Sequence, residues 1–351
     1  MNIMAVYGIG IFLACFFVMT FALSRIPTDI FPEDYDFKLD PFWYMISVLF
    51  LGGSVAYFIF PQVSDMVHPF SYLTLLLPII FAILIYFCYL LDVHWLTNVV
   101  LLSAAAVITF MQPEGFILFP KYLTPLQDKF VIIALIFVFA KGLGLLNGLG
   151  AIASLQFSTV MGAMILLSYF GAVPQLFGVI AFSYLGTMLA FSFFSWPPEK
   201  IVISHGAFVS LGFIMACFML AGATEFAEAS VFISASYLIT EVFISFYNHF
   251  IIRDKMPDLF MSTSYYKSSQ NGQFEKGVVR GVLKILLINA VLSLMQIVAS
   301  ERFALPFFSV MLNLWFLSIL SGDTKPEELF SLSKFGKSII KGLFSKKETK
   351  S

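Results

Sequence analysis

The sequence has few charged residues and few of the side chains that soluble enzymes commonly use for catalysis. Only 12% of its 351 residues are charged, and it contains 4 His and 3 Cys. By contrast, 60% of the residues are hydrophobic and 43 are Phe. A soluble domain carries about 25% charged residues and cannot bury this much apolar surface. The composition therefore excludes a cytosolic enzyme, a secreted domain and a disordered chain, and it predicts that lipid surrounds most of the protein.

Other shortages restrict the function further. The net charge of −1 leaves no general excess of positive charge, so we expect no nucleic-acid partner. Cys15, Cys88 and Cys217 lie in apolar stretches without the spacing of a metal site, and we expect them to be small core residues. The sequence also lacks a Walker loop and a GxSxG nucleophile motif.

Long apolar stretches are what the sequence has in abundance, and about 20 such residues cross a bilayer. Eleven candidates are residues 3–23, 42–60, 70–91, 96–111, 130–146, 151–170, 173–193, 201–222, 229–252, 279–299 and 304–320. The fourth and the last are short, so they need tilt or polar flanks. The sequence therefore predicts an all-α, polytopic integral membrane protein with about 11 transmembrane helices.

The distribution of Lys and Arg predicts the orientation, because cytoplasmic loops carry an excess of both. If the N-terminus is outside, only Lys121, Lys129 and Arg302 fall in outer loops. We therefore predict an N-out, C-in topology. Pro197 and Pro198 cannot continue a helix, so we expect a short rigid inner loop there.

The chain divides into a transmembrane domain, residues 1–322, and a cytoplasmic tail, residues 323–351. In the tail, apolar residues from Phe330 to Phe344 recur near helical spacing and lysines lie between them. This pattern is typical of an amphipathic helix on a leaflet of anionic lipids, and a solvated basic tail is the alternative.

In the transmembrane domain, Gly171 and Ala172 predict a tight hairpin between two spans.

Four segments at predicted inner ends of spans together carry a family resemblance. They are Leu90-Leu91-Asp92-Val93, the stretch from Lys141 to Ser154, the stretch from Leu185 to Gly212 that contains Trp196-Pro197-Pro198-Glu199-Lys200, and the loop 257–280. In this order they resemble the polyprenyl-phosphate N-acetylhexosamine-1-phosphate transferases of glycosyltransferase family 4. That family includes phospho-N-acetylmuramoyl-pentapeptide transferase and the GlcNAc-1-phosphate transferase that starts O-antigen. The resemblance covers nearly the whole chain and implies a transferase-like transmembrane domain.

The sequence departs from the family at the residues that carry its chemistry. Family members transfer a sugar-1-phosphate from a UDP-sugar to a polyprenyl phosphate, with Mg²⁺ on the diphosphate. Here Leu91 replaces the first Asp of a pair, so only Asp92 remains, while Asn147 and His205 replace two further Asp residues. The resemblance thus implies that Asp92, Asn147 and His205 occupy relic or rewired catalytic positions. We expect no metal cofactor, with His205 as the one candidate ligand, and Mg²⁺ or another divalent metal if the chain is active.

Six further residues are candidates for substrate binding: Lys141, Lys200, Glu241, Tyr265, Tyr266 and Lys267. Lys141 lies near the inner end of a span, where it either snorkels to the headgroups or neutralises Asp92. Glu241 lies inside a span, and we expect it to face the site or to be ion-paired. The first inner loop contains an acidic cluster, which we interpret as a solvated loop: Asp29, Glu33, Asp34, Asp36 and Asp40.

Three functions are consistent with these features. The first is a non-catalytic relative that binds a polyprenyl-phosphate carrier or a membrane protein in cell-envelope polysaccharide synthesis. The second is an active transferase with rearranged metal ligands, and the third is a lipid or ion transporter that uses Lys141, Asp92 and Glu241. We expect a multi-pass protein of the bacterial cytoplasmic membrane, with anionic lipids bound through the tail and a partner membrane protein or a second copy as further partners.

Overall fold

A computed structural model describes residues 3–26, 40–64, 72–112, 123–148, 150–223, 228–247, 263–264, 268, 275–299 and 304–320. Within these ranges the protein is helical and contains no strand. The long helices are α1 (Ile3–Leu23), α2 (Pro41–Ser64), α3 (Tyr72–Leu90), α4 (His94–Phe110), α5 (Pro125–Leu145), α6 (Gly150–Tyr169), α7 (Gln175–Ser195), α8 (His205–Gly222), α9 (Glu228–Phe246), α11 (Glu275–Val298) and α12 (Ala304–Leu320). The amphipathic helix expected in 323–351 lies outside the described residues.

Each of the eleven expected spans coincides with one of these helices. Seven of them are long and apolar enough to cross a membrane, namely α1, α2, α6, α7, α8, α9 and α11. The apolar stretches of α3, α4 and α12 are shorter, and α5 contains the charged residues Asp128, Lys129 and Lys141. The described residues therefore form a helical membrane protein.

Three helix starts differ from the expected ones by four or five residues, and two of these have a local polar cause. α5 starts five residues early, at Pro125, because Gln127 turns back to accept a hydrogen bond from the backbone N–H of Thr124 (3.0 Å). α8 starts at His205 instead of residue 201, because the Ser204 hydroxyl accepts a hydrogen bond from the backbone N–H of Ala207 (3.3 Å). α11 starts at Glu275, four residues early.

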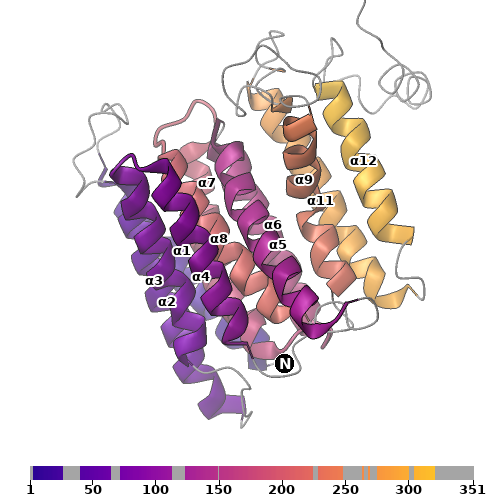
Figure 1. The fold of residues 1–351 in the computed structure, drawn as a ribbon. Helices are drawn as coiled ribbons and strands as arrows, with labels where there is room; N and C mark the ends of the chain where they lie inside the picture. The colour runs from indigo at the N-terminus through magenta and orange to yellow at the C-terminus, as the bar shows by residue number, and fades with distance from the viewer. Residues whose placement is uncertain are drawn as a thin grey trace, which may run out of the picture.

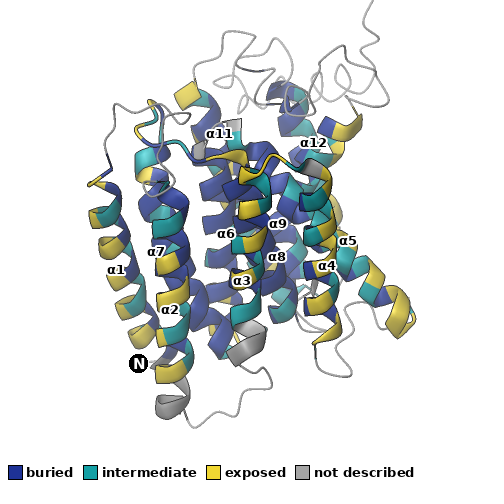
Figure 2. Ribbon diagram, turned by 60° about the vertical axis from the view of Figure 1, so that its left-hand side comes forward, coloured by how far each residue is buried: buried dark blue, intermediate teal, exposed yellow. Residues whose placement is uncertain are grey.

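The helices run alternately up and down in a single bundle (Figure 1). α7 packs against α1, α2 and α6, while α8 packs against α3 and α5. On the other side, α9, α11 and α12 pack together, and α11 also contacts α6. Most residues of α6, α7 and α8 are buried, whereas α1 exposes much of its surface (Figure 2). The central helices therefore form the core, and the outer helices provide the apolar surface that lipid would cover.

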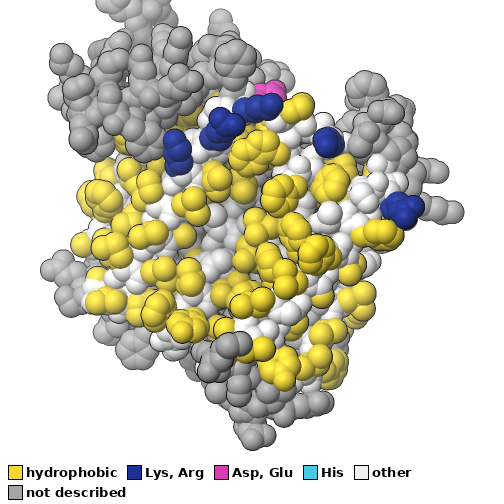
Figure 3. Space-filling model, turned by 180° about the vertical axis from the view of Figure 1, so that it is seen from behind, with side chains coloured by type: hydrophobic (Ala, Val, Ile, Leu, Met, Phe, Trp, Pro, Cys, Tyr) yellow, Lys and Arg dark blue, Asp and Glu magenta, His cyan; other side chains and the backbone are white. Residues whose placement is uncertain are grey.

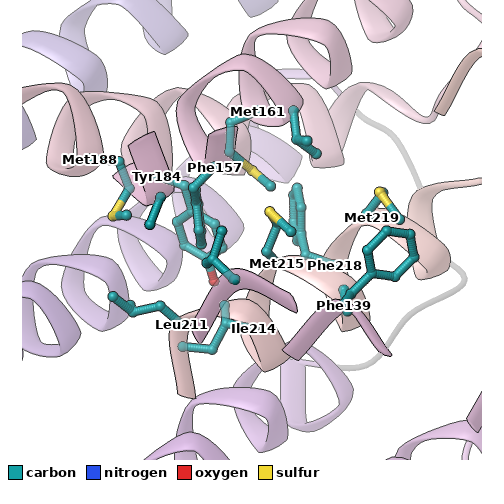
Figure 4. Close-up of a cluster of buried hydrophobic side chains, with 14 of the residues drawn as sticks. Phe139, Phe157, Met161, Tyr184, Met188, Leu211, Ile214, Met215, Phe218 and Met219 are labelled. Atoms are coloured by element: carbon teal, nitrogen blue, oxygen red, sulfur yellow. The ribbon is translucent and has the colours of Figure 1, made fainter. Parts of the chain in front are cut away.

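The centre of the bundle is filled by aromatic and sulfur-containing side chains (Figure 4). Phe157 from α6, Tyr184 from α7 and Phe218 from α8 form a chain of contacting rings, with centroids 6.3 Å and 5.2 Å apart. Met215 lies beside them and is fully buried. Because Met side chains are unbranched and flexible, they fill the irregular gaps that rigid rings leave.

The two expected breaks in the helices are present. Gly171 has a φ of 77°, and its successor Ala172 donates a backbone hydrogen bond to the Leu167 carbonyl (2.9 Å), which ends α6. α7 ends at Ser195, directly before Trp196-Pro197-Pro198, and the Pro197–Pro198 peptide bond is cis. The Lys200 N–H donates to the Phe194 carbonyl (2.9 Å) and closes this loop.

A closed ring of polar side chains ties α9, α11 and α12 together. Asn289 donates to Asn313 (3.0 Å) and accepts from Ser309 (2.8 Å), while Asn313 donates to Ser236 (2.9 Å). The Ser236 and Ser309 hydroxyls, 2.7 Å apart, complete the ring. All four side chains are buried. Hydrogen bonds between helices are a main source of association in a membrane, where lipid provides no hydrophobic drive.

Candidate functional site

The described residues of the segments that carry the family resemblance lie toward one end of the bundle, the upper end in Figure 1. Because neighbouring helices alternate in direction, this end collects the last residues of α3, α5, α7 and α9 together with the first residues of α2, α4 and α8. Residues separated by more than 100 positions are thereby placed around one cluster of polar side chains, whose central member is Lys141.

Lys141, in the last turns of α5, is held by aromatic side chains. Its ammonium nitrogen donates a hydrogen bond to the hydroxyl of Tyr89 on α3 (2.8 Å). The same nitrogen lies 5.2 Å from the centre of the Tyr89 ring and 6.0 Å from that of Phe137. The hydrogen bond to the Tyr89 hydroxyl favours a charged amine at this position. Lys141 is thus fixed among aromatic rings, and Tyr89 is the partner that the structure gives it.

His205, the first residue of α8, also contacts Tyr89. The two rings meet edge to face with centroids 5.7 Å apart, and the His205 side chain is exposed. The close approach depends on small neighbours, since a Cβ at Gly206 would lie 2.5 Å from the Cβ of Tyr89. A Cβ at Gly144 would lie 2.9 Å from the His205 ring. The structure thus joins Lys141, Tyr89 and His205 in one contact series across α5, α3 and α8.

A second tyrosine, Tyr86, lies one turn before Tyr89 and connects α2 to α8. Its hydroxyl donates a hydrogen bond to the Asp40 carboxylate and is also hydrogen-bonded to Ser204, which directly precedes His205. Asp40 in turn accepts from the backbone N–H of Phe42 (2.8 Å) and caps α2. Burial is the main influence on this carboxyl and raises its pKa above the ordinary aspartate value, although both hydrogen bonds oppose the rise.

This geometry corrects the interpretation of the acidic cluster in the first inner loop. Asp40 is not a solvated loop residue, because it is half-buried and bonded to Tyr86. Its place immediately before Pro41 explains the difference, since the first turn of α2 needs an acceptor for its free N–H groups. The other four members, Asp29, Glu33, Asp34 and Asp36, lie outside the described residues.

Three further candidates lie at the same end. Asn147, in the short turn between α5 and α6, donates to the Ile203 carbonyl (3.2 Å) and so fixes the approach to α8. Asp92 is exposed in the turn between α3 and α4, with a φ of 54° that Asp tolerates better than most residues. Its backbone N–H donates to the Tyr89 carbonyl (3.0 Å). Lys200 is exposed in the loop after α7.

Glu241 is buried near the end of α9. One of its carboxylate oxygens accepts a hydrogen bond from the backbone N–H of Ser264 (2.6 Å), which lies between α9 and α11 in the sequence. α9 packs on α5 next to Lys141, since a Cβ at Gly142 would lie 2.6 Å from the Val242 side chain. Tyr265, Tyr266 and Lys267 follow Ser264 in the sequence but lie outside the described residues.

The side chains at this end do not match the donor set of a magnesium site. Mg²⁺ binds oxygen ligands, above all carboxylates, whereas the centre of the cluster contains an ammonium group, an imidazole and phenol hydroxyls. In the part of the chain that the structure describes, no three His, Cys, Asp or Glu side chains gather as metal ligands would. The arrangement instead offers positive charge and hydroxyl donors, which suit an anionic group such as a phosphate.

The tyrosines are the functional candidates that the sequence analysis did not single out. Tyr86 and Tyr89 are three residues apart on one helix, which places both hydroxyls on the same face. This spacing at the inner end of an apolar span was the signal available in the sequence. In comparisons with known protein families and with curated proteins, the chain matches none of them.

Proposed function

We propose that the protein binds a polyprenyl-phosphate lipid carrier in a bacterial cytoplasmic membrane and does not itself transfer sugar phosphate. In this proposal it is a diverged relative of the polyprenyl-phosphate N-acetylhexosamine-1-phosphate transferases. Its N-terminus lies outside, so that the end of the bundle with Lys141 and His205 faces the cytoplasm. Fold resemblance alone does not determine function, so the proposal depends on the chemistry of this cluster.

The placement of Lys141 is the observation that carries the proposal. A lysine ammonium can donate three hydrogen bonds, and among the described residues Tyr89 accepts one of them. A terminal phosphate on a lipid has several acceptor oxygens and up to two negative charges, so it can take the remaining donors. The amine then performs the charge neutralisation that Mg²⁺ performs in the family. His205, which contacts Tyr89, and Ser204, which bonds to Tyr86, are further hydrogen-bonding groups of the cluster.

The surroundings also suit a long hydrocarbon chain. Leu91 and Trp95, which flank the turn after Tyr89, expose 68% and 69% of their surface. These exposed apolar side chains lie at the end of α3 and the start of α4, close in sequence to Tyr89, and in this proposal a prenyl tail packs on them while its phosphate reaches Lys141. Phosphate recognition by the cluster and tail contact with lipid-facing side chains together define an amphipathic ligand.

Transfer of sugar phosphate is disfavoured by the same residues. In-line displacement on a diphosphate depends on metal ions that hold and neutralise the leaving phosphate. The positions that the family gives to acidic ligands hold Asn147 and His205 here, and neither supplies a carboxylate. In this proposal Asn147 has only a structural role, as the donor of a hydrogen bond to the Ile203 carbonyl. Glu241 positions Ser264 by accepting its backbone N–H.

Binding of undecaprenyl phosphate by the purified protein tests the proposal. We expect Lys141→Gln to weaken the affinity by about 10- to 100-fold, as for a lost charge-assisted hydrogen bond. Lys129→Gln is the matched control. Lys129 lies on the same helix at the opposite end, and its amine is also placed over a ring, 4.7 Å from the centre of Phe110. Equal affinities for wild type and Lys141→Gln would contradict the proposal, provided both variants elute as monodisperse folded protein.

A transfer assay separates this proposal from an active transferase. Wild type is incubated with labelled UDP-GlcNAc or UDP-GalNAc, undecaprenyl phosphate and Mg²⁺, Mn²⁺ or Zn²⁺ in turn. We expect no lipid-linked sugar in any of these reactions. Turnover that disappears in His205→Ala would overturn the non-catalytic proposal and identify a rearranged metal site.

A further inference from the structure

The exposed face of α11 changes character along its length. Lys276, Arg280 and Lys284 are all exposed and are spaced four residues apart, so they form one stripe over the first turns of the helix. Figure 3 shows the basic side chains of this face of the molecule gathered toward its upper end, above a broad hydrophobic surface. Glu275 adds one negative charge at the tip, about 100° around the helix from Lys276, and the stripe remains positive.

Below the three cations the same stripe is entirely apolar. Leu287, Val291, Met295 and Val298 continue it at helical spacing and are exposed by 53%, 55%, 54% and 89%. No described helix covers these side chains, because α11 packs on α6, α9 and α12 through its other faces. In an ordinary amphipathic helix the polar and apolar residues lie on opposite faces. Here they follow one another along a single face.

The lengths of the two parts match those of a phospholipid. From Lys276 to Lys284 the helix rises about 12 Å, and from Leu287 to Val298 it rises about 16 Å. One leaflet contributes about 15 Å of hydrocarbon to a bilayer. The apolar part therefore has the length of a leaflet's acyl region, and the cationic part reaches from it into the headgroup region. Lys284, at the boundary, can extend its amine toward the headgroups.

We infer that this stripe, Lys276 to Val298 on α11, is a binding site for a diacyl phospholipid with an anionic headgroup. The phosphate and headgroup charge lie against Lys276, Arg280 and Lys284, and the acyl chains lie along Leu287, Val291 and Met295. Charge complementarity selects the lipid class, since a zwitterionic headgroup gains much less from three adjacent cations. The site is distinct from the Lys141 cluster and does not depend on the function proposed for it.

Native mass spectrometry of the detergent-purified protein tests this site, with phosphatidylglycerol and phosphatidylcholine titrated at equal concentrations. We expect wild type to retain phosphatidylglycerol more strongly, by about fivefold for each cation that takes part. The triple variant Lys276→Gln/Arg280→Gln/Lys284→Gln should lose this preference. The charge-conserving variant Lys276→Arg/Arg280→Lys/Lys284→Arg should keep it, and so should Arg25→Gln, which removes an exposed cation in the turn directly after α1.

Four outcomes would overturn the inference. The first is an unchanged preference for phosphatidylglycerol in the triple Gln variant. The second is a preference of wild type for undecaprenyl phosphate alone that the triple variant loses, since the stripe would then bind the carrier lipid. The third is dissociation of a dimer in the triple variant without a change in lipid retention, which would make the stripe a contact between copies. Loss of the preference in the charge-conserving variant would also count against it, because charge would then not be the cause.

Discussion

The carboxylate of Glu241, buried in α9, accepts a hydrogen bond from the backbone N–H of Ser264, 23 residues later in the chain (2.6 Å). This contact fixes Ser264, which lies between α9 and α11 in the sequence, against the helical bundle. It also explains why a carboxyl group is present inside an apolar helix, since a buried backbone N–H needs an acceptor. Two residues that the sequence analysis treated separately are therefore parts of one structural unit.

Removing the Glu241 acceptor should destabilise the protein. Glu241→Ala leaves the buried Ser264 N–H without this partner, and we expect a loss of about 1–3 kcal/mol in unfolding free energy. Glu241→Gln keeps an acceptor oxygen of the same reach, so it should lose clearly less. Thermal unfolding in detergent measures both, with Glu275→Gln, an exposed carboxylate on α11, as the control. Equal losses for Ala and Gln would show that the acceptor is not what Glu241 contributes.

Enlarging Gly144 should disturb the candidate site. A Cβ there would lie 2.4 Å from the Val209 side chain and 2.9 Å from the His205 ring, so α8 must shift away from α5. We expect Gly144→Ala to lower stability by about 1–3 kcal/mol, as for overpacking, and to weaken polyprenyl-phosphate binding. Gly162→Ala is the matched control, because it is also helical and has no atom within 4 Å of the added Cβ. If the two variants unfold alike, the close contact of α5 and α8 is wrong.

The stability contribution of Asp40 should depend on pH. Its pKa is raised in the folded protein, mainly by burial, so the folded state binds more protons than the unfolded state just above the ordinary aspartate pKa of about 3.9. Stability from this group is then present at lower pH and is lost as the pH rises through the raised pKa.

The variant Asp40→Asn does not titrate. Its one carbonyl oxygen can still cap α2, and its amide NH₂ group, which replaces the oxygen that accepts from Tyr86, can donate to the Tyr86 hydroxyl instead. Its stability relative to wild type should therefore increase as the pH rises from about 4 and become constant at higher pH. Tyr86→Phe removes a hydrogen bond that lowers the Asp40 pKa, so it should extend this dependence to higher pH. Denaturation of all three proteins at a series of pH values measures the effect. A relative stability of Asp40→Asn that falls with rising pH would refute the assignment.

The polar ring of α9, α11 and α12 should hold these helices together. Asn289 makes two of the ring's hydrogen bonds, one with Asn313 and one with Ser309. A hydrogen bond between membrane helices contributes about 0.6 kcal/mol on average. We expect Asn289→Ala to lose about 1–2 kcal/mol. A double-mutant cycle with Asn313→Ala should show positive coupling, whereas a cycle with Ser192→Ala, in the separate pair with Ser154, should be additive. Additivity of Asn289 and Asn313 would mean that the ring contributes nothing as a unit.

The sequence contained enough information for the helices but not for their exact ends. Apolar length predicted each of the eleven described helices, because a spanning segment must satisfy its backbone internally and be apolar over its whole length. The starts of α5 and α8 were wrong by four or five residues. Both are determined by single hydrogen bonds at Thr124 and Ser204, which hydropathy does not register.

The candidate site was predictable in its position but not in its contacts. Alternation of span direction is sufficient to place Asp92, Lys141, Asn147 and His205 at one end of the bundle. The partner of Lys141 was not predictable in the same way. The sequence offered Asp92 or the lipid headgroups, and the structure gives Tyr89. Asp40, interpreted as solvated, is bonded to Tyr86, because a loop residue next to a helix start can turn into the bundle.

The sequence by itself determined that this is a helical membrane protein, because hydropathy acts locally along the chain. Only the tertiary structure decided which residues from α3, α5 and α8 touch. That choice depends on close approaches at Gly144 and Gly206 and on the directions of side chains such as Tyr86 and Tyr89. Such contacts join residues far apart in sequence, and shape complementarity between packed helices selects them.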